Sequence, residues 1–460
     1  MSEVAINKKN KSIKRENIFT IFRDGDIFTK LSFLIMGFAN FTRKQIVKGL
    51  IYLACEISFI FFMITTGVER IKGLMTLGTK TQGWVMDEAL GIEVLSQGDN
   101  SMLFLLYGVC TMMVVAVFIA VYISNIYSAR KLQVLEENNE HIPTLREDIH
   151  DLLDNKFHVT LMIIPMIMVG VFTVLPLIYM ILIAFTNYDK DHQPPGALFH
   201  WVGLDNFGDM LFSASTFSQT FFPVLGWTLV WAVVATATCY FGGIILALLI
   251  NKDGIKFKKG WRTIFVTTMA IPQFISLLIM RIMLNDYGPI NALLQNLGIT
   301  DGIIQFLVNP HWARIVVIVV NFWIGVPFTM LSTTGILQNI PGELYEAAKI
   351  DGANALTIFW KITLPYMIFV MTPNLITSFT GNINNFNVIY LLSGGGPTNA
   401  KYYFAGDTDL LVTWLYKLTI DRADYNLGAV IGILTFVVLA TVSLITYRNT
   451  ASYKDEGAFQ

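Results

Sequence analysis

Residues 341–365 read PGELYEAAKIDGANALTIFWKITLP and connect the apolar stretch 312–336 to the apolar stretch 362–386. A helix of about 20 apolar residues crosses the roughly 30 Å hydrocarbon core of a bilayer. Of the 460 residues, 54% are hydrophobic and only 14% are charged, against roughly 25% charged in soluble domains. The sequence therefore predicts an all-α integral membrane protein in which 341–365 is a loop at the membrane surface.

The residue types in this loop predict two short helices. Pro341 suits the first position of a helix, and Gly352 suits its C-terminal cap. Asn354 can cap a second helix. Glu343 and Glu346 favour the N-terminal end of the first helix, where the helix dipole is positive.

Eight apolar stretches are long enough to span a bilayer. They are 46–67, 102–126, 158–185, 224–250, 262–284, 312–336, 362–386 and 427–447. A shorter apolar stretch, 31–41, is followed by Arg43 and Lys44. We expect it to form an interfacial helix or a buried lead-in to the first span.

The distribution of Lys and Arg predicts the orientation of the spans. If both termini are cytoplasmic, the cytoplasmic segments hold 22 of these residues and the outer loops hold 7. Positively charged loops are retained on the cytoplasmic side. We therefore expect both termini and the 341–365 loop in the cytoplasm.

The first helix of the loop has a surface that a partner protein could approach closely. Ala347 and Ala348 leave a low, smooth patch, and Glu346 and Asp351 offer acceptors beside it. These features are typical of a helix that lies in a groove of another protein.

The loop carries an ordered set of residues: Glu346-Ala347-Ala348, three residues, Gly352, nine residues, and then Ile362-x-Leu364-Pro365. This set resembles the EAA motif of permease subunits in binding-protein-dependent ABC importers. The resemblance implies that these residues, together with Asp351, couple the chain to a separate ATPase whose closure on ATP moves the spans. The alternative is an ordinary linker rich in alanine and glycine.

The resemblance extends over roughly 185–447 and is strongest to MalF-type maltose permease subunits. The similar segments are 184–189 (AFTNYD), 203–207 (GLDNF), 321–328 (NFWIGVPF), 384–386 (NNF), 395–397 (GGP) and 408–412 (TDLLV). It implies a type I permease core in the C-terminal half. The expected division is a cytoplasmic N-terminus (1–45), accessory spans (46–223), the permease domain (224–447) and a cytoplasmic tail (448–460). Enteric members carry a large domain between spans three and four, where this chain has only a short loop.

The seventh span is unusually polar for a helix that faces lipid. Ser378, Asn382 and Asn385 have helical spacing on one face, and Gly381 leaves room beside them. Amide groups offer both donors and acceptors to sugar hydroxyls. The resemblance places these residues at sugar-binding positions, with Gly381 replacing an aromatic residue. The alternative is that they form interhelical hydrogen bonds.

The sixth span contributes a second group, Asn321, Ile324, Gly325 and Phe328. The resemblance places them at sugar-contact positions, where Phe328 replaces a tyrosine. Pro327 would loosen the backbone, as in broken helices that line substrate paths. The alternative is that Phe328 packs in the core and Pro327 only bends the helix.

The chain lacks the sequence signatures of several other classes of function. The chain has no Walker A sequence, no H-E-x-x-H and no G-x-S-x-G, and its three cysteines form no C-x-x-C pair. A sugar symporter would need a carboxylate for its coupling ion, but spans three to eight contain none. Glu56 lies in the first span, where we expect it to have a structural partner.

The resemblance also implies the partners and the location of the chain. We expect a transport subunit with no cofactor of its own, because ATP and Mg would bind to the partner ATPase. The expected partners are a MalG-type second permease, two copies of the ATP-binding subunit and an extracytoplasmic sugar-binding protein. The expected substrate is maltose or maltodextrin, or another sugar carried by the same machinery. We expect a bacterial cytoplasmic membrane and no nucleic-acid partner.

Overall fold

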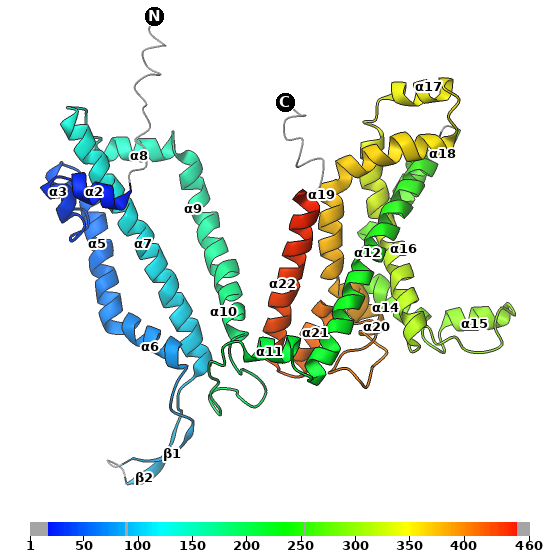
Figure 1. Cartoon of the computed structure of the whole chain (residues 1–460), viewed down its shortest axis with the longest axis horizontal. Coiled ribbons are helices and arrows are strands. Elements are labelled where there is room, and N and C mark those ends of the chain that lie inside the picture. The colour runs from blue at the N-terminus through cyan, green and yellow to red at the C-terminus, as the bar shows by residue number, and fades with distance from the viewer. Residues whose placement is uncertain (1–16, 88–90, 253, 449–460) are drawn as a thin grey trace, which may run out of the picture. The chain divides into compact units, whose positions relative to one another are not determined.

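The computed structural model describes residues 17–87, 91–252 and 254–448 (Figure 1). Two compact units divide the chain, and we describe each by itself. One comprises residues up to Leu182 and the segment Asp191–Trp201; the other comprises Ile183–Lys190 and the residues from Val202 onward. The basic residues at 8–15 and most of the predicted C-terminal tail lie outside the described part of the chain.

The first unit combines long helices with short helices and one β-hairpin. Its helices are α2 (Ile18–Asp24), α3 (Ile27–Leu31), α4 (Phe38–Thr42), α5 (Ile46–Phe62), α6 (Val68–Thr76), α7 (Ser101–Glu137), α8 (Leu145–Leu153), α9 (Phe157–Val169) and α10 (Leu175–Ile183). Strands β1 (Gly83–Asp87) and β2 (Ile92–Ser96) pair antiparallel. π-helical turns join α5 to α6 (Met63–Gly67) and α9 to α10 (Gly170–Val174).

In the residues that the structure describes, the second unit consists of helices and connecting loops and has no β-strand. Its helices are α11 (Asp205–Leu211), α12 (Thr216–Asn251), α13 (Lys258–Ala270), α14 (Gln273–Met283), α15 (Pro289–Asn296), α16 (Pro310–Leu337), α17 (Gly342–Ile350), α18 (Ala355–Ile358), α19 (Leu364–Ile383), α20 (Phe386–Ser393), α21 (Leu411–Tyr416) and α22 (Tyr425–Arg448). π-helical turns cover Phe359–Thr363 and Lys417–Asp421.

Seven helical stretches in the described residues are long and apolar enough to cross a membrane, and a bent pair would make an eighth. This agrees with the predicted all-α membrane fold. The bent pair is the predicted span 262–284, in which α13 and α14 meet at 88°. Its cause is Pro272, which pushes the preceding Ile271 to an extended conformation (φ −78°, ψ 124°) and ends α13. The fifth span is therefore broken rather than continuous.

The short apolar stretch 31–41 does not span. It forms the end of α3, a turn and most of α4, and none of the candidate spans includes it. The helix α7 continues 11 residues past the predicted limit of the second span.

The core of the second unit forms where α12, α16 and α19 pack together (Figure 1). Trp231 of α12 and Val317 of α16 are fully buried in a cluster that also contains Leu277 of α14. Nearer the 341–365 loop, Tyr240 and Ile244 of α12 pack against Leu364, Met367 and Met371. These contacts hold together the three helices that line the cavity described below.

Candidate functional site

The 341–365 loop forms the two short helices that its sequence predicts, α17 and α18. Pro341 is one residue outside the predicted position, because it precedes α17 instead of opening it. Gly352 has a φ of +75°, the left-handed conformation that follows many helix C-termini and that glycine adopts without strain. The Asn354 side chain caps α18. It accepts hydrogen bonds from the Thr357 amide at 2.8 Å and from the Thr357 hydroxyl at 2.9 Å.

The first half of the motif faces outward from the chain. Glu346, Ala347, Asp351 and Gly352 are exposed, and Ala348 is half-buried. Large apolar side chains lie in the same two helices: Ile350 is 87% exposed and Leu356 is 69% exposed. These side chains add apolar area to the surface that a partner could contact.

The second half of the motif is tied to the helix core. Ile362 is half-buried in the π-helical turn, Leu364 is buried against the end of α12, and Pro365 opens α19. The Tyr345 hydroxyl of α17 lies 3.2 Å from the Thr363 hydroxyl, a contact that the sequence did not predict. This contact joins α17 to the residue directly before α19.

A cavity of about 510 Å³ lies among α12, α16 and α19. All eight predicted substrate residues line it: Asn321, Ile324, Gly325, Phe328, Ser378, Gly381, Asn382 and Asn385. The structure thus brings the two predicted groups together. That they bind sugar stays a prediction.

Asn385 differs from the prediction in its local structure. The helix α19 ends at Ile383, so Asn385 does not continue the helical face of Ser378 and Asn382. It precedes α20 instead, where its side-chain oxygen accepts from the Val388 amide at 3.2 Å. The side chain still reaches the cavity because the chain turns at this point.

Amide side chains form a network along the cavity wall. The Asn385 Nδ2 group donates to the side-chain oxygens of Asn321 at 3.3 Å and Asn382 at 3.4 Å. Asn382 Nδ2 donates to the Thr236 hydroxyl at 3.0 Å. The same amides therefore join helices and line the cavity, so the two alternatives from the sequence are compatible.

Two glycines in the site have different surroundings. A Cβ on Gly325 would lie 2.6 Å from Cys239 Sγ, so glycine permits α12 and α16 to approach each other. A Cβ on Gly381 would meet no atom within 4 Å. Gly381 therefore leaves open the space where the resemblance expects an aromatic ring.

Other cavity residues were missed by sequence reasoning. Gln273 follows the break at Pro272, and its side-chain oxygen accepts a 3.4 Å hydrogen bond from Asn387 Nδ2. Thr236 and Tyr240 come from α12, whose continuous apolar sequence gave no sign of a polar wall. A glutamine directly after a proline inside an apolar stretch was the available signal for Gln273.

The charge of the cavity restricts its ligands. Among the described residues that line it there is no Asp, Glu, Lys, Arg or His. The described residues also contain no cluster of metal-ligating side chains. A cavity lined by neutral amides, hydroxyls and an exposed phenyl ring suits a neutral polyhydroxyl ligand.

Comparisons with known proteins identify the family of the chain. The family described as binding-protein-dependent transport system inner membrane component matches residues 239–452. The galactooligosaccharides transport system permease protein GanP of Bacillus subtilis (strain 168) is 34% identical, over 92% of this chain and 97% of its own length. The maltodextrin transport system permease protein MdxF of the same strain is 35% identical, over 92% and 95%.

Solved structures give the same result. A bacterial ABC transporter involved in the import of the acidic polysaccharide alginate matches with a TM-score of 0.54 and 25% identity, over 65% of this chain and 96% of that chain. The chain belongs to the inner membrane components of binding-protein-dependent ABC transport systems. It is a multi-pass transport subunit, as the apolar stretches and the motif in 341–365 together predicted.

Proposed function

We propose that the chain is the MalF-type permease subunit of an ATP-driven importer that moves maltose or maltodextrins into the cell. The observation that carries the proposal is the convergence of eight predicted substrate residues on one neutral, amide-lined cavity. The 35% identity to the maltodextrin permease MdxF over nearly the whole chain supports this substrate class.

Coupling would pass through α17 and α18. Their exposed residues Glu346, Ala347 and Asp351, with Ile350 beside them, would lie in a cleft of a partner ATPase. The buried residue Leu364 and the Tyr345–Thr363 contact would pass the motion to α19, which also lines the cavity. In this account ATP and Mg bind to the partner, and the chain itself binds no cofactor.

The complete importer would contain a second, MalG-type permease, two ATPase subunits and an extracytoplasmic sugar-binding protein. The excess of Lys and Arg in the predicted inner loops supports a bacterial cytoplasmic membrane with both termini inside. A loop between spans three and four of roughly 40 residues offers the binding protein little surface there.

A second candidate is the same machinery acting on galactooligosaccharides. It is favoured by the 34% identity to GanP, which covers 97% of that relative. Both classes are neutral oligosaccharides, so the neutral cavity is compatible with either. The residues that differ from the MalF-type pattern, Gly381 and Phe328, are where we expect the two specificities to separate.

The test is ATP-driven uptake of labelled maltotriose and a labelled galactotriose by the complete importer in proteoliposomes. We expect maltotriose uptake, and a two- to tenfold higher KM in Asn382→Ala, because one neutral hydrogen bond contributes about 0.5–1.5 kcal/mol. Thr377→Ala is the matched control, since Thr377 is exposed on the same helix but does not line the cavity.

The outcomes separate the candidates. Uptake of the galactotriose alone would replace the first substrate class with the second. An unchanged KM in Asn382→Ala for whichever sugar is transported would contradict the assignment of the cavity as the sugar site.

A further inference from the structure

The short apolar segment before the first span folds into a hairpin against α7. Its two arms are α3 and α4, and a turn at Ser32–Gly37 joins them. In the C-terminal half of α7, five side chains contact the hairpin at successive points: Tyr122, Asn125, Ser128, Gln133 and Glu136. The hairpin therefore lies along α7 from its tip to its base.

The tip of the hairpin is held by polar side chains that belong to spanning helices. Tyr122 donates to the Phe33 carbonyl at 2.7 Å. Asn125 is fully buried; it donates to the Ser32 carbonyl at 2.9 Å and accepts from the Gly37 amide at 2.8 Å. Four backbone groups of the turn have side-chain partners in α5 and α7, the fourth being the Met36 amide, which donates to Glu56 at 2.8 Å.

These contacts explain why Glu56 is present in an apolar helix. It lies eight residues beyond Lys48, about 12 Å of helix rise, and its carboxylate binds the turn. Gly37, with a φ of +82°, lies so close to α5 that a Cβ would be 2.3 Å from the Gly49 carbonyl oxygen. The turn is thus fixed against both spans by its backbone.

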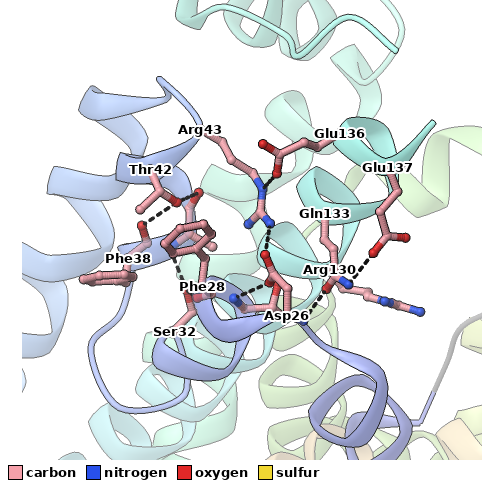
Figure 2. Close-up of polar contacts among 12 residues, drawn as sticks. Asp26, Phe28, Ser32, Phe38, Thr42, Arg43, Arg130, Gln133, Glu136 and Glu137 are labelled. Atoms are coloured by element: carbon pink, nitrogen blue, oxygen red, sulfur yellow. Dashed lines mark hydrogen bonds and ion pairs between the residues drawn. The ribbon is translucent and has the colours of Figure 1, made fainter. Parts of the chain in front are cut away.

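The base of the hairpin is held by ion pairs between charged side chains. Arg43, with only 1% of its side chain exposed, binds Asp26 and Glu136 at 2.6 Å each. Figure 2 shows this guanidinium between the two carboxylates, with Gln133 and Glu137 next to them. Glu136 is 56% exposed, so the base meets water while it clamps the two arms together.

The tip and the base of the hairpin contact α7 at widely separated positions. Tyr122 and Glu136 are fourteen residues apart, about 21 Å of helix rise. The ion-paired base and the tip lie at opposite ends of this distance. At the tip, Leu34 is 74% exposed and Ile35 is 40% exposed.

Irregular backbone inside a bilayer is tolerated only where protein groups satisfy its N–H and C=O groups. In the turn Ser32–Gly37, all six N–H groups and four of the six C=O groups have protein partners. Exposed apolar residues, including Ile46 and Leu50, also lie on α5, which the turn contacts. We infer that the segment Asp26–Arg43 is a re-entrant hairpin whose tip, Leu34 and Ile35, inserts into the acyl-chain region of the leaflet at the N-terminal end of α5. It enters and leaves on one side without crossing.

A depth measurement on the full-length chain tests this inference. Cys55, Cys110 and Cys239 are replaced by alanine, and one spin label is attached at Leu34→Cys in vesicles of phosphatidylcholine and phosphatidylglycerol. Ile57→Cys, on the exposed face of α5, is the lipid control, and Arg23→Cys, which is 79% exposed, is the water control. We expect the label at position 34 to collide more often with oxygen than with a water-soluble nickel chelate. The label at position 57 should show the same preference, and the label at position 23 should collide more often with the nickel chelate.

Two results would overturn the inference. Frequent collision with nickel at position 34 would show that the tip lies in water. Infrequent collision with both reagents would show that protein, such as another copy or another part of the chain, covers the tip.

A second variant tests how the hairpin is held. Asn125→Leu removes the partner of Ser32 and Gly37, and we expect the nickel collision frequency at position 34 to rise towards that at position 23. Thr111→Val is the matched control, because Thr111 is also fully buried on α7 but its hydroxyl bonds within its own helix. An unchanged nickel collision frequency at position 34 in Asn125→Leu would contradict the role of the spans in holding the turn.

Discussion

Phe328 is the residue at which we expect the proposed sugar specificity of the cavity to be set. Its ring is 53% exposed and lines the cavity wall. The MalF-type pattern has a tyrosine at this position, so the chain lacks one hydroxyl that could bind the substrate. The amides of Asn321, Asn382 and Asn385 are left as the principal hydrogen-bonding groups between α16 and α19.

Restoring this hydroxyl gives a gain-of-function prediction. We expect Phe328→Tyr to lower the KM for maltotriose two- to tenfold, because one added neutral hydrogen bond contributes about 0.5–1.5 kcal/mol. Uptake kinetics in proteoliposomes measure it. Phe436→Tyr is the control, since Phe436 is exposed on α22 and does not line the cavity. A raised KM in Phe328→Tyr would mean that the ring itself, rather than a missing hydroxyl, makes the contact.

At the residue scale, the sequence located several polar groups of the site but missed Gln273. Ser378, Asn382 and Asn385 were predicted, and so was the cap at Asn354. Tyr240 was not, because a tyrosine in an apolar helix is ordinary and only the packing of α12 against α19 places it at the cavity. Residues that acquire a role through tertiary contact carry no local signal.

The elements themselves follow from rules of local structure. Pro272 breaks the fifth span, and Gly352 ends α17, each through a backbone preference that the residue type alone dictates. The angle of the break could not be predicted, because packing rather than propensity determines how two helix segments meet. The extent of α7 was also underestimated, since an apolar count stops where the helix leaves the bilayer.

The short helix α8 gives a prediction about pH. Glu147 and Thr144 form a capping box at its start. Hydrogen bonds from the Thr144 amide, and then from His141 and the Thr144 hydroxyl, lower the pKa of Glu147 from 4.5 to about 2. A folded-state pKa below the unfolded value means that the ionised carboxylate stabilises the helix above about pH 4.5, and that this stabilisation is lost as the pH falls towards 2.

Hydrogen exchange of the amides in the first turn of α8, corrected for intrinsic rates, measures this effect. We expect constant protection between pH 7 and 5 and a progressive loss below about 4.5. Glu147→Gln keeps an acceptor at the cap but cannot titrate, so its protection should not change with pH over this range. An equal loss of protection in both proteins would show that another group controls α8.

At the scale of the whole molecule, the helix α19 connects the exposed loop to the cavity. The exposed motif in α17 is joined to Leu364, and α19 then extends from Leu364 to the cavity residues Ser378 and Asn382. The sequence predicted both ends of this connection. The Tyr345–Thr363 contact and the packing of α12 against α19 became visible only in the structure.

The central claim is that α17 couples a partner ATPase to transport, and two glycines allow a matched test. Gly352 and Gly298 each follow a helix, have φ values of +75° and +65°, and would meet no atom within 4 Å if a Cβ were added. A valine causes similar backbone strain at both positions. Only at Gly352 would its side chain also meet the proposed ATPase.

The most direct measurement is therefore ATP-driven uptake of the transported sugar by proteoliposomes that contain the complete importer with Gly352→Val or Gly298→Val, at equal amounts of inserted chain. We predict that Gly352→Val abolishes uptake and that Gly298→Val retains it. Equal uptake by the two variants would contradict the assignment of α17 as the coupling element.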